Sequence, residues 1–319
     1  MKYAKKLMKQ SEMGVLIPLL ILWMVTFMAN HAFFSSTNMV ALSRSVSITL
    51  LGSIGATILF SCGMMDLSAG SIFGLSGVVV SICMNNYGLP VSVSILFAVI
   101  AGALVGLLNG IIVNSFSIPA FITTLGTSYF ARGIVNVISK GKAYTGLPDA
   151  FNALGAFGPL GIPWSVYIAL VMAVLVALAL KYTVFGRSLL AVGGNTEASR
   201  VCGLNVSAIR NIAFICNGIL CSLAGILSTA RLNTAQPSAG TGWEMTVIAA
   251  TIIGGVSMYG GYATIVGALI GVAIMETLTV SMTMIKVNPY WQRVVIGVII
   301  ILAVGIDTYR RKKLSGAKE

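Results

Sequence analysis

Long apolar segments separated by short polar connections fill nearly the whole of this 319-residue chain. Ten of them can be drawn, and most are about long enough to cross a bilayer as a helix, which takes roughly 20 residues. Only 9% of the residues are charged, against about 25% in soluble domains. The sequence therefore excludes a soluble enzyme and predicts an all-α polytopic membrane protein with about ten transmembrane helices, some of them broken. The segments run about 13–32, 46–63, 67–84, 90–113, 118–138, 164–182, 209–230, 244–258, 262–285 and 291–307.

The net charge of +12 is concentrated at the ends of these segments. Because basic residues are retained on the cytoplasmic side of a membrane, we expect both termini and the central connection in the cytoplasm. Placement at segment ends also argues against nucleic-acid binding. The basic residues behind this orientation are Lys2, Lys5, Lys6 and Lys9, then Lys181, Arg187, Arg200 and Arg210, and finally Arg310, Arg311, Lys312, Lys313 and Lys318.

The expected organisation is one transmembrane domain over 13–308, between a cytoplasmic segment 1–12 and a cytoplasmic basic tail 309–319. Two connections are long, and the orientation places 139–163 outside and 183–208 inside. With a single histidine and five cysteines that form no C-x-x-C spacing, the sequence predicts no metal site. It also contains no G-x-x-x-x-G-K-[ST] phosphate cradle, so ATP hydrolysis would need a partner.

Glycine is abundant, at 35 residues, and recurs at helical spacing. Small residues four apart share one helix face and allow a neighbouring backbone to approach closely. We interpret these positions as packing seams rather than as the lining of a pore. They are Gly70-x-x-x-Gly74, Gly102-x-x-x-Gly106-x-x-x-Gly110 and Gly267-x-x-x-Gly271.

Polar residues gather at two interruptions of the apolar segments. At the first, Asp66 or Ser68 can cap the helix that follows, and a broken helix can also line a polar cavity with its ends and hydroxyls. Both interpretations can hold together. At the second, Pro119 interrupts the amide ladder close to Thr123 and Thr124.

The connection at 183–208 is polar for this chain. Between Asn195 and Gly203 it predicts a short helix that an Asn or Thr caps and a Gly ends. Glu197 and Arg200 are three residues apart and therefore share a face of that helix. Such a helix is either a plain connection or a docking element for a partner, and the residues alone leave both open.

Acidic residues inside the apolar segments are rare. Of the eight Asp and Glu residues, only Glu276 lies well inside a segment. Because an uncompensated charge at the bilayer centre is costly, Glu276 indicates either a helix–helix hydrogen bond or a functional group. One acid gives little support to an ion-coupled secondary transporter. One histidine without paired carboxylates gives little support to a membrane-embedded enzyme.

Over nearly its whole length the sequence resembles the sugar-import permeases of ATP-binding-cassette (ABC) transporters, the ribose/galactoside/xylose group. Five blocks in the same order carry the resemblance. Cys62-Gly63-Met64-Met65 and Tyr262-Ala263 depart from the family's pattern, and the first departure bears on substrate preference if that break lines the path. The blocks are Asp66-Leu67-Ser68-Ala69-Gly70-Ser71, Pro119-Ala120-Phe121-Ile122-Thr123-Thr124-Leu125-Gly126, Gly186-Arg187 with Gly193-Gly194-Asn195, Gln236-Pro237-Ser238-Ala239-Gly240-Thr241-Gly242-Trp243-Glu244, and Ile253-Gly254-Gly255-Val256-Ser257-Met258-Tyr259-Gly260-Gly261.

The resemblance implies the permease subunit of an ABC importer, a multi-pass protein of the bacterial inner membrane. Such a subunit forms the path for a monosaccharide, a ribose-like pentose or a hexose, and is not itself an enzyme. The implied partners are cytoplasmic ABC ATPase subunits, a second permease copy (identical or a close paralogue) and an external sugar-binding protein; no cofactor is implied. A branched-chain amino-acid or nucleoside permease of the same fold is the alternative, and the block at Asp66 favours sugars.

The polar breaks and the resemblance together assign candidate functional residues to two places. Those of the translocation path or its helix breaks are Asp66, Ser68, Ser71, Pro119, Phe121, Thr123 and Thr124. Those of the loop that couples the permease to the ATPase are Gly186, Arg187, Gly193, Gly194, Asn195, Glu197, Arg200 and Gly203.

Overall fold

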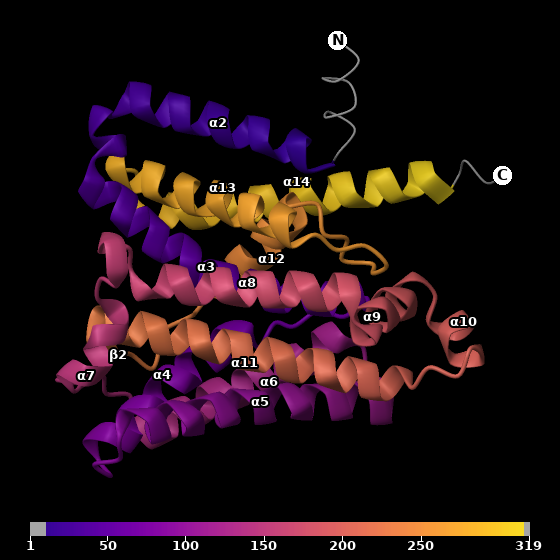
Figure 1. The fold of residues 1–319 in the computed structure, drawn as a ribbon, viewed down its shortest axis with the longest axis horizontal. Helices are drawn as coiled ribbons and strands as arrows, with labels where there is room; N and C mark the ends of the chain where they lie inside the picture. Colours follow the sequence, from indigo (N-terminus) through magenta and orange to yellow (C-terminus); the bar gives the residue numbers. More distant parts are fainter. Residues whose placement is uncertain (1–10, 316–319) are drawn as a thin grey trace.

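The computed structural model describes residues 11–315, which form an almost entirely α-helical bundle (Figure 1). Each of the ten predicted apolar segments coincides with a helix, so the predicted all-α membrane class is confirmed. Lys2, Lys5, Lys6, Lys9 and Lys318 lie outside the described residues. The ten helices are α2 (Ser11–Ala29), α3 (Ser36–Ser61), α4 (Ala69–Asn85), α5 (Val91–Phe116), α6 (Ala120–Ser139), α8 (Trp164–Tyr182), α11 (Val206–Leu232), α12 (Trp243–Ile253), α13 (Ile265–Met284) and α14 (Pro289–Ser315).

These helices differ in length. Five of them, α3, α5, α8, α11 and α13, are long and apolar enough to cross a membrane. The shortest, α12, has 11 residues and rises about 17 Å, roughly half of the hydrocarbon core. Helix α4 begins only at Ala69, after an irregular stretch that follows Ser61. The bundle therefore combines continuous helices with interrupted ones, as predicted.

The connections contain smaller elements. Two short strands, β1 (Tyr144–Thr145) and β2 (Thr234–Ala235), pair antiparallel with Tyr144 opposite Ala235. The connection predicted at 183–208 is mostly helical, with α9 (Val184–Gly194) and α10 (Thr196–Val201). The other elements are η1 (His31–Phe34), α7 (Asp149–Asn152), η2 (Ala153–Gly155) and η3 (Pro159–Gly161).

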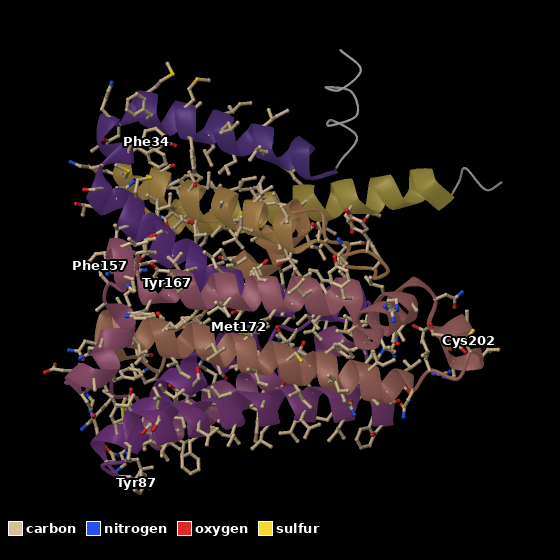
Figure 2. The ribbon with its side chains drawn as sticks, in the orientation of Figure 1. Phe34, Tyr87, Phe157, Tyr167, Met172 and Cys202 are labelled. Atoms are coloured by element: carbon tan, nitrogen blue, oxygen red, sulfur yellow. The ribbon has the colours of Figure 1, made fainter. Side chains whose placement is uncertain are left out.

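The two ends of the bundle carry different connecting elements. Helices α9 and α10 lie at one end, and α7 and β2 lie at the other (Figure 1). The start of α2 and the end of α14 both point toward α10. Figure 2 places the exposed Cys202 at the α10 end and Tyr87 and Phe157 at the opposite end. We call these the α10 end and the α7 end.

Glycine seams hold the centre of the bundle together. Gly106 of α5 lies against the Phe214 carbonyl of α11, and Gly271 of α13 lies against the Ala250 carbonyl of α12, so a larger side chain would overlap either neighbour. Gly70 and Gly74 of α4 lie against the Gly240 and Ala239 carbonyls of the loop after β2, beside the side chains of Glu244 and Arg132. The predicted seams are therefore present, and one of them joins a helix to a loop. Residues 47–61 of α3 are buried throughout.

Candidate functional site

The chain leaves helical geometry between α3 and α4, at the first predicted break. Gly63 has a φ of +72°, which a glycine adopts without steric cost. Asp66 is 6% exposed. Its Oδ1 accepts hydrogen bonds from the backbone amide and from the hydroxyl of Ser68, both at 2.6 Å. Asp66 therefore accepts the amide of Ser68, the residue just before α4, while neither Asp66 nor Ser68 caps an amide of the first turn of α4 with its side chain.

A buried hydrogen-bond network extends from Asp66 to three more helices. Asn217 of α11 donates from Nδ2 to Asp66 Oδ2 at 2.6 Å. Asn109 of α5 donates from Nδ2 to Ser68 Oγ at 2.9 Å, and Thr127 of α6 donates its hydroxyl to Asn109 Oδ1 at 2.6 Å. Because buried polar groups are costly unless they are paired, these bonds hold the break in one geometry. We call these five residues the Asp66 network.

The second predicted break contacts the first. The Thr124 hydroxyl accepts from the Leu67 amide at 3.0 Å and donates to the Ala120 carbonyl at 2.9 Å. The start of α6 is thereby tied to the stretch before α4. Ser117, just ahead of Pro119, has a φ of +54° and ends α5.

The remaining predicted path residues behave differently from one another. Thr123 is buried, and its hydroxyl has no hydrogen-bond partner among the described residues. Ser71 bonds to the Ser128 carbonyl at 2.9 Å. Phe121 is 52% exposed, and Pro119 is exposed at the start of α6. The structure thus brings Asp66, Ser68 and Thr124 together and leaves the other four outside that cluster.

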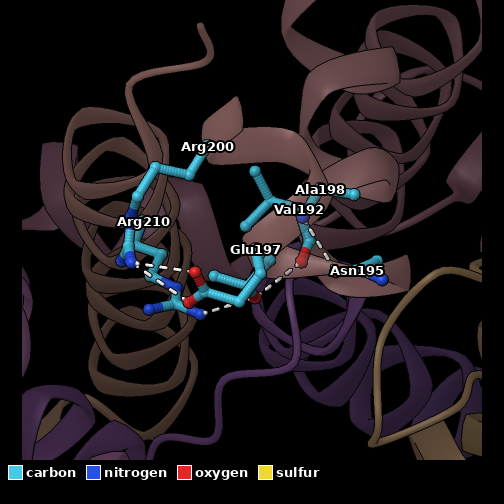
Figure 3. Close-up of polar contacts among 7 residues, drawn as sticks. Val192, Asn195, Glu197, Ala198, Arg200 and Arg210 are labelled. Atoms are coloured by element: carbon cyan, nitrogen blue, oxygen red, sulfur yellow. Dashed lines mark hydrogen bonds and ion pairs between the residues drawn. The ribbon is translucent and has the colours of Figure 1, made fainter. Parts of the chain in front are cut away.

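Helices α9 and α10 are separated by the single residue Asn195, and we call the pair the α9–α10 hairpin; Figure 3 shows the polar contacts around it. The Thr183 hydroxyl accepts from the Gly186 amide at 3.1 Å and starts α9. Asn195 Oδ1 accepts from the Ala198 amide at 2.9 Å and starts α10, as predicted for the short helix before Gly203. Glu197 and Arg200 form an exposed ion pair at 3.0 Å. Helix α9 itself was not predicted.

Other predicted residues shape this hairpin. Gly186 lies against the Ala179 and Leu180 backbone, so that α9 folds back on α8. Gly203 has a φ of +81° and ends the α10 segment. The Arg210 guanidinium of α11 donates to the Thr196 hydroxyl at 3.1 Å and ties α10 to the bundle. Arg187 and Arg200 are both exposed; Arg187 donates to the Tyr182 carbonyl at 3.3 Å, and Arg200 pairs with Glu197.

The hairpin meets the first break through glycine. Gly193 lies directly against the Ser61 carbonyl, which also accepts from the Gly261 amide at 3.1 Å. Gly260, with a φ of +92°, lies against the Gly193 backbone, and Gly261 lies against Gly194. Residues from separate blocks of the sequence therefore meet backbone to backbone. We call these five residues the glycine junction.

Glu276 forms a helix–helix hydrogen bond. Its Oε1 accepts from the Thr49 hydroxyl at 2.7 Å, which joins α13 to α3. Thr49 in turn accepts from Trp243 Nε1 at 3.3 Å. Of the two predicted roles of Glu276, the structure bears out the hydrogen bond. Among residues 11–315, no three His, Cys, Asp or Glu side chains are placed to hold a metal ion.

Two features at the α7 end were missed by the sequence analysis. A cavity of about 1050 Å³ lies where α11, the loop after β2, α12 and α14 meet. None of the seven predicted path residues lines it. Arg132 of α6 donates to the carbonyls of Pro237 and Ala239 in that loop, at 2.7 and 2.6 Å. The sequence feature that points to both is the block at 236–244, because most residues of the loop 236–242 line the cavity.

Comparisons with known proteins identify relatives of the whole chain. The family model described as "Branched-chain amino acid transport system / permease component" matches residues 38–304. The ribose import permease protein of Escherichia coli is 36% identical over 306 residues, which cover 94% of each chain. The L-arabinose ABC transporter permease protein of Azospirillum brasilense is 35% identical over 307 residues, 96% of this chain and 90% of the relative. The autoinducer 2 import system permease protein of Photorhabdus laumondii is 33% identical over 305 residues, 95% and 91% of the two chains. No solved structure matches.

Proposed function

Because this chain belongs to the family of import permeases that includes the ribose, L-arabinose and autoinducer 2 permeases, we propose that it carries a monosaccharide across the bacterial inner membrane. In this proposal it is the transmembrane subunit of an ATP-driven importer, and its substrate is a pentose or a hexose. The observation that carries the proposal is the match over nearly the whole chain to two sugar permeases. A second permease copy, cytoplasmic ATPases and an external binding protein complete the transporter.

The α9–α10 hairpin is the proposed contact with the ATPase. A docking element must transmit motion without bending, and the capped helix starts and the hydrogen bond to α11 make the hairpin rigid. Arg187 and Arg200 are exposed and can face a partner. Partner carboxylates would pair with the two guanidinium groups, which form bidentate bonds with such groups. The glycine junction then links the hairpin to the Asp66 break.

The orientation follows from the same assignment. We propose that both termini are cytoplasmic, with residues 1–12 and 309–319 flanking one transmembrane domain at 13–308 of about ten crossings. The connection at 139–163 is then external. Two observations support this orientation: most Lys and Arg residues lie in the segments assigned to the inside, and the start of α2 and the end of α14 point to the α10 end (Figure 1).

Helix breaks are the proposed moving parts of the path. Asp66, Ser68 and Thr124 hold the two breaks together, so they control the geometry of the path rather than contact the substrate. Thr123 carries a buried hydroxyl without a partner, which suits a group that meets the substrate when the breaks rearrange.

Reconstitution tests the proposed function. The permease, the ATPase and the binding protein are assembled in proteoliposomes, and ATP-driven uptake of labelled D-ribose, L-arabinose and L-leucine is measured. We expect sugar uptake that requires ATP and all three components. Uptake of L-leucine without sugar uptake would favour the amino-acid permease that the family description names. Uptake driven by an ion gradient without the ATPase would contradict the ABC assignment.

A further inference from the structure

The cavity at the α7 end is large enough for a monosaccharide. Its volume is about 1050 Å³, at the upper end of the range typical of small-molecule sites. It lies between the last turn of α11, the loop 236–242 and the first turns of α12 and α14. In the proposed orientation this end faces outward, where a binding protein would release its cargo.

The wall of the cavity formed by the loop 236–242 is held in place. Arg132 donates to the carbonyls of Pro237, Ala239 and Gly70, the last at 3.0 Å. Gly240, at a φ of +75°, lies against the Gly70 carbonyl with no room for a side chain. Two hydrogen bonds from Arg132 thus tie the loop to α6, and the close backbone contact ties it to α4, which Arg132 also bonds. A site built on such a loop is formed before the ligand arrives, which lowers the cost of binding.

The cavity combines an aromatic wall with free polar groups. Trp243 packs against Phe73 with ring centroids 4.7 Å apart, and its Nε1 is anchored on Thr49. Gln236 and Arg293 are exposed and Thr246 is half-buried, and the side chains of these three form no hydrogen bond with any other described residue. Aromatic rings pack against the apolar C–H face of a sugar, while amides, hydroxyls and guanidinium groups bond to its hydroxyls. Such a mixture of apolar surface and a few polar groups is typical of small-molecule sites.

The charge of the lining discriminates between ligand classes. Arg293 is the charged side chain among the lining residues, and no Asp or Glu belongs to that lining. The ammonium group of an amino acid would therefore meet no counter-charge in this lining. A neutral polyol needs no counter-charge.

We propose that the α7-end cavity is the site at which the permease receives its sugar, and that Gln236, Thr246 and Trp243 recognise a neutral polyol there. Arg132 acts as a positioning residue for the loop. The inference rests on the proposed function and specifies where and how that substrate is bound.

The experiment uses the purified permease alone in lipid vesicles, without ATPase or binding protein. Cys202, the exposed cysteine of the described residues, is replaced by Cys202→Ser, and a reporter thiol is introduced by Met245→Cys, an exposed lining position. Alkylation by an impermeant maleimide is followed with D-ribose, L-arabinose or L-leucine present. Asn86→Cys, at an exposed amide of the α7 end outside the cavity lining, is the control reporter.

We expect a sugar to slow alkylation at position 245 and not at position 86. Gln236→Ala and Thr246→Val, added to the Met245→Cys reporter, should each raise the half-protecting sugar concentration about fivefold, the size expected for one lost hydrogen bond. Asn86→Ala should leave that concentration unchanged.

The other outcomes separate this inference from the proposed function. Protection by L-leucine instead of a sugar overturns the polyol assignment. ATP-driven sugar uptake by the complete transporter without protection at position 245 overturns the site alone. Protection without any ATP-driven uptake supports the site and contradicts the proposed function, and the absence of both contradicts both.

Discussion

Gly193 lies so close to the carbonyl oxygen of Ser61 that no side chain fits between them. Ser61 is the last residue of α3, and Gly193 is next to the last residue of α9. The contact therefore joins the α9–α10 hairpin to the break that contains Asp66. Because both partners are backbone atoms, a displacement of the hairpin reaches the break without passing through flexible side chains.

Gly193→Ala should damage this junction. Its Cβ would overlap the Ser61 carbonyl and crowd the Gly261 amide, and overpacking of this kind costs about 1–3 kcal/mol. We expect a lower midpoint of thermal unfolding for the purified permease and a marked loss of ATP-driven uptake. Gly194→Ala is the matched control, because a Cβ there meets nothing within 4 Å. A Gly193→Ala protein that unfolds and transports like the parent protein would show that the junction tolerates a side chain.

Ser68→Ala should lower the stability of the protein, and Thr123→Val should leave it unchanged. Ser68→Ala removes one bond to Asp66 and leaves the Asn109 amide without its acceptor, at a cost of about 1–3 kcal/mol. Thr123→Val keeps the shape of the side chain and breaks no hydrogen bond within the described residues, so the unfolding midpoint should not fall.

Uptake then decides the role of Thr123. We expect the Thr123→Val variant to be as stable as the parent protein and slower in ATP-driven uptake, because a hydroxyl is lost from the path. Thermal unfolding and initial uptake rates, measured on the same preparations, separate the two effects. Normal uptake by a stable Thr123→Val protein would reduce Thr123 to a packing residue.

Hydropathy was sufficient to locate the membrane helices, because a bilayer demands long apolar segments whatever their neighbours are. It failed for α9, where Phe185, Leu189 and Val192 recur at helical spacing inside a connection that was interpreted as polar. Thr183, the cap of that helix, was visible in the sequence. The composition of this connection hides the helix, and only the periodicity of its apolar residues indicates it.

The partners of Asp66 could not be predicted from one sequence. Asn217 is 151 residues away in the chain, and nothing in a single sequence records which polar residue meets which. Thr123 and Thr124 are adjacent threonines, and the sequence gives no reason to assign them different roles. Only the packing of α6 against the break gives Thr124 a bond to Leu67 and leaves Thr123 without a partner.

A proline in the interior of α10 should disrupt the contact between the permease and the ATPase. The Ser199 amide donates to the Asn195 carbonyl at 3.0 Å, so Ser199→Pro removes a hydrogen bond in a helix of six residues. Glu197 is the second residue of α10, and amides of the first turn have no partner within the helix, so proline there removes no helix hydrogen bond. We expect Ser199→Pro to abolish ATPase co-purification, and Glu197→Pro to keep most of it, because the exposed ion pair that it removes contributes only about 0–1 kcal/mol. Co-purification by both variants would place the ATPase contact on another surface.

Native and introduced thiols test the orientation. Cys202 is exposed at the α10 end (Figure 2), so an impermeant maleimide should leave it unmodified in intact spheroplasts and modify it in inside-out vesicles. A second thiol, introduced by Lys142→Cys into a Cys202→Ser protein, occupies an exposed position in the connection 139–163. It should react in spheroplasts and not in inside-out vesicles, because a charged reagent does not cross the bilayer. The two thiols are each other's control for access and reactivity. The reverse pattern would place the α10 end outside, where it could not meet a cytoplasmic ATPase.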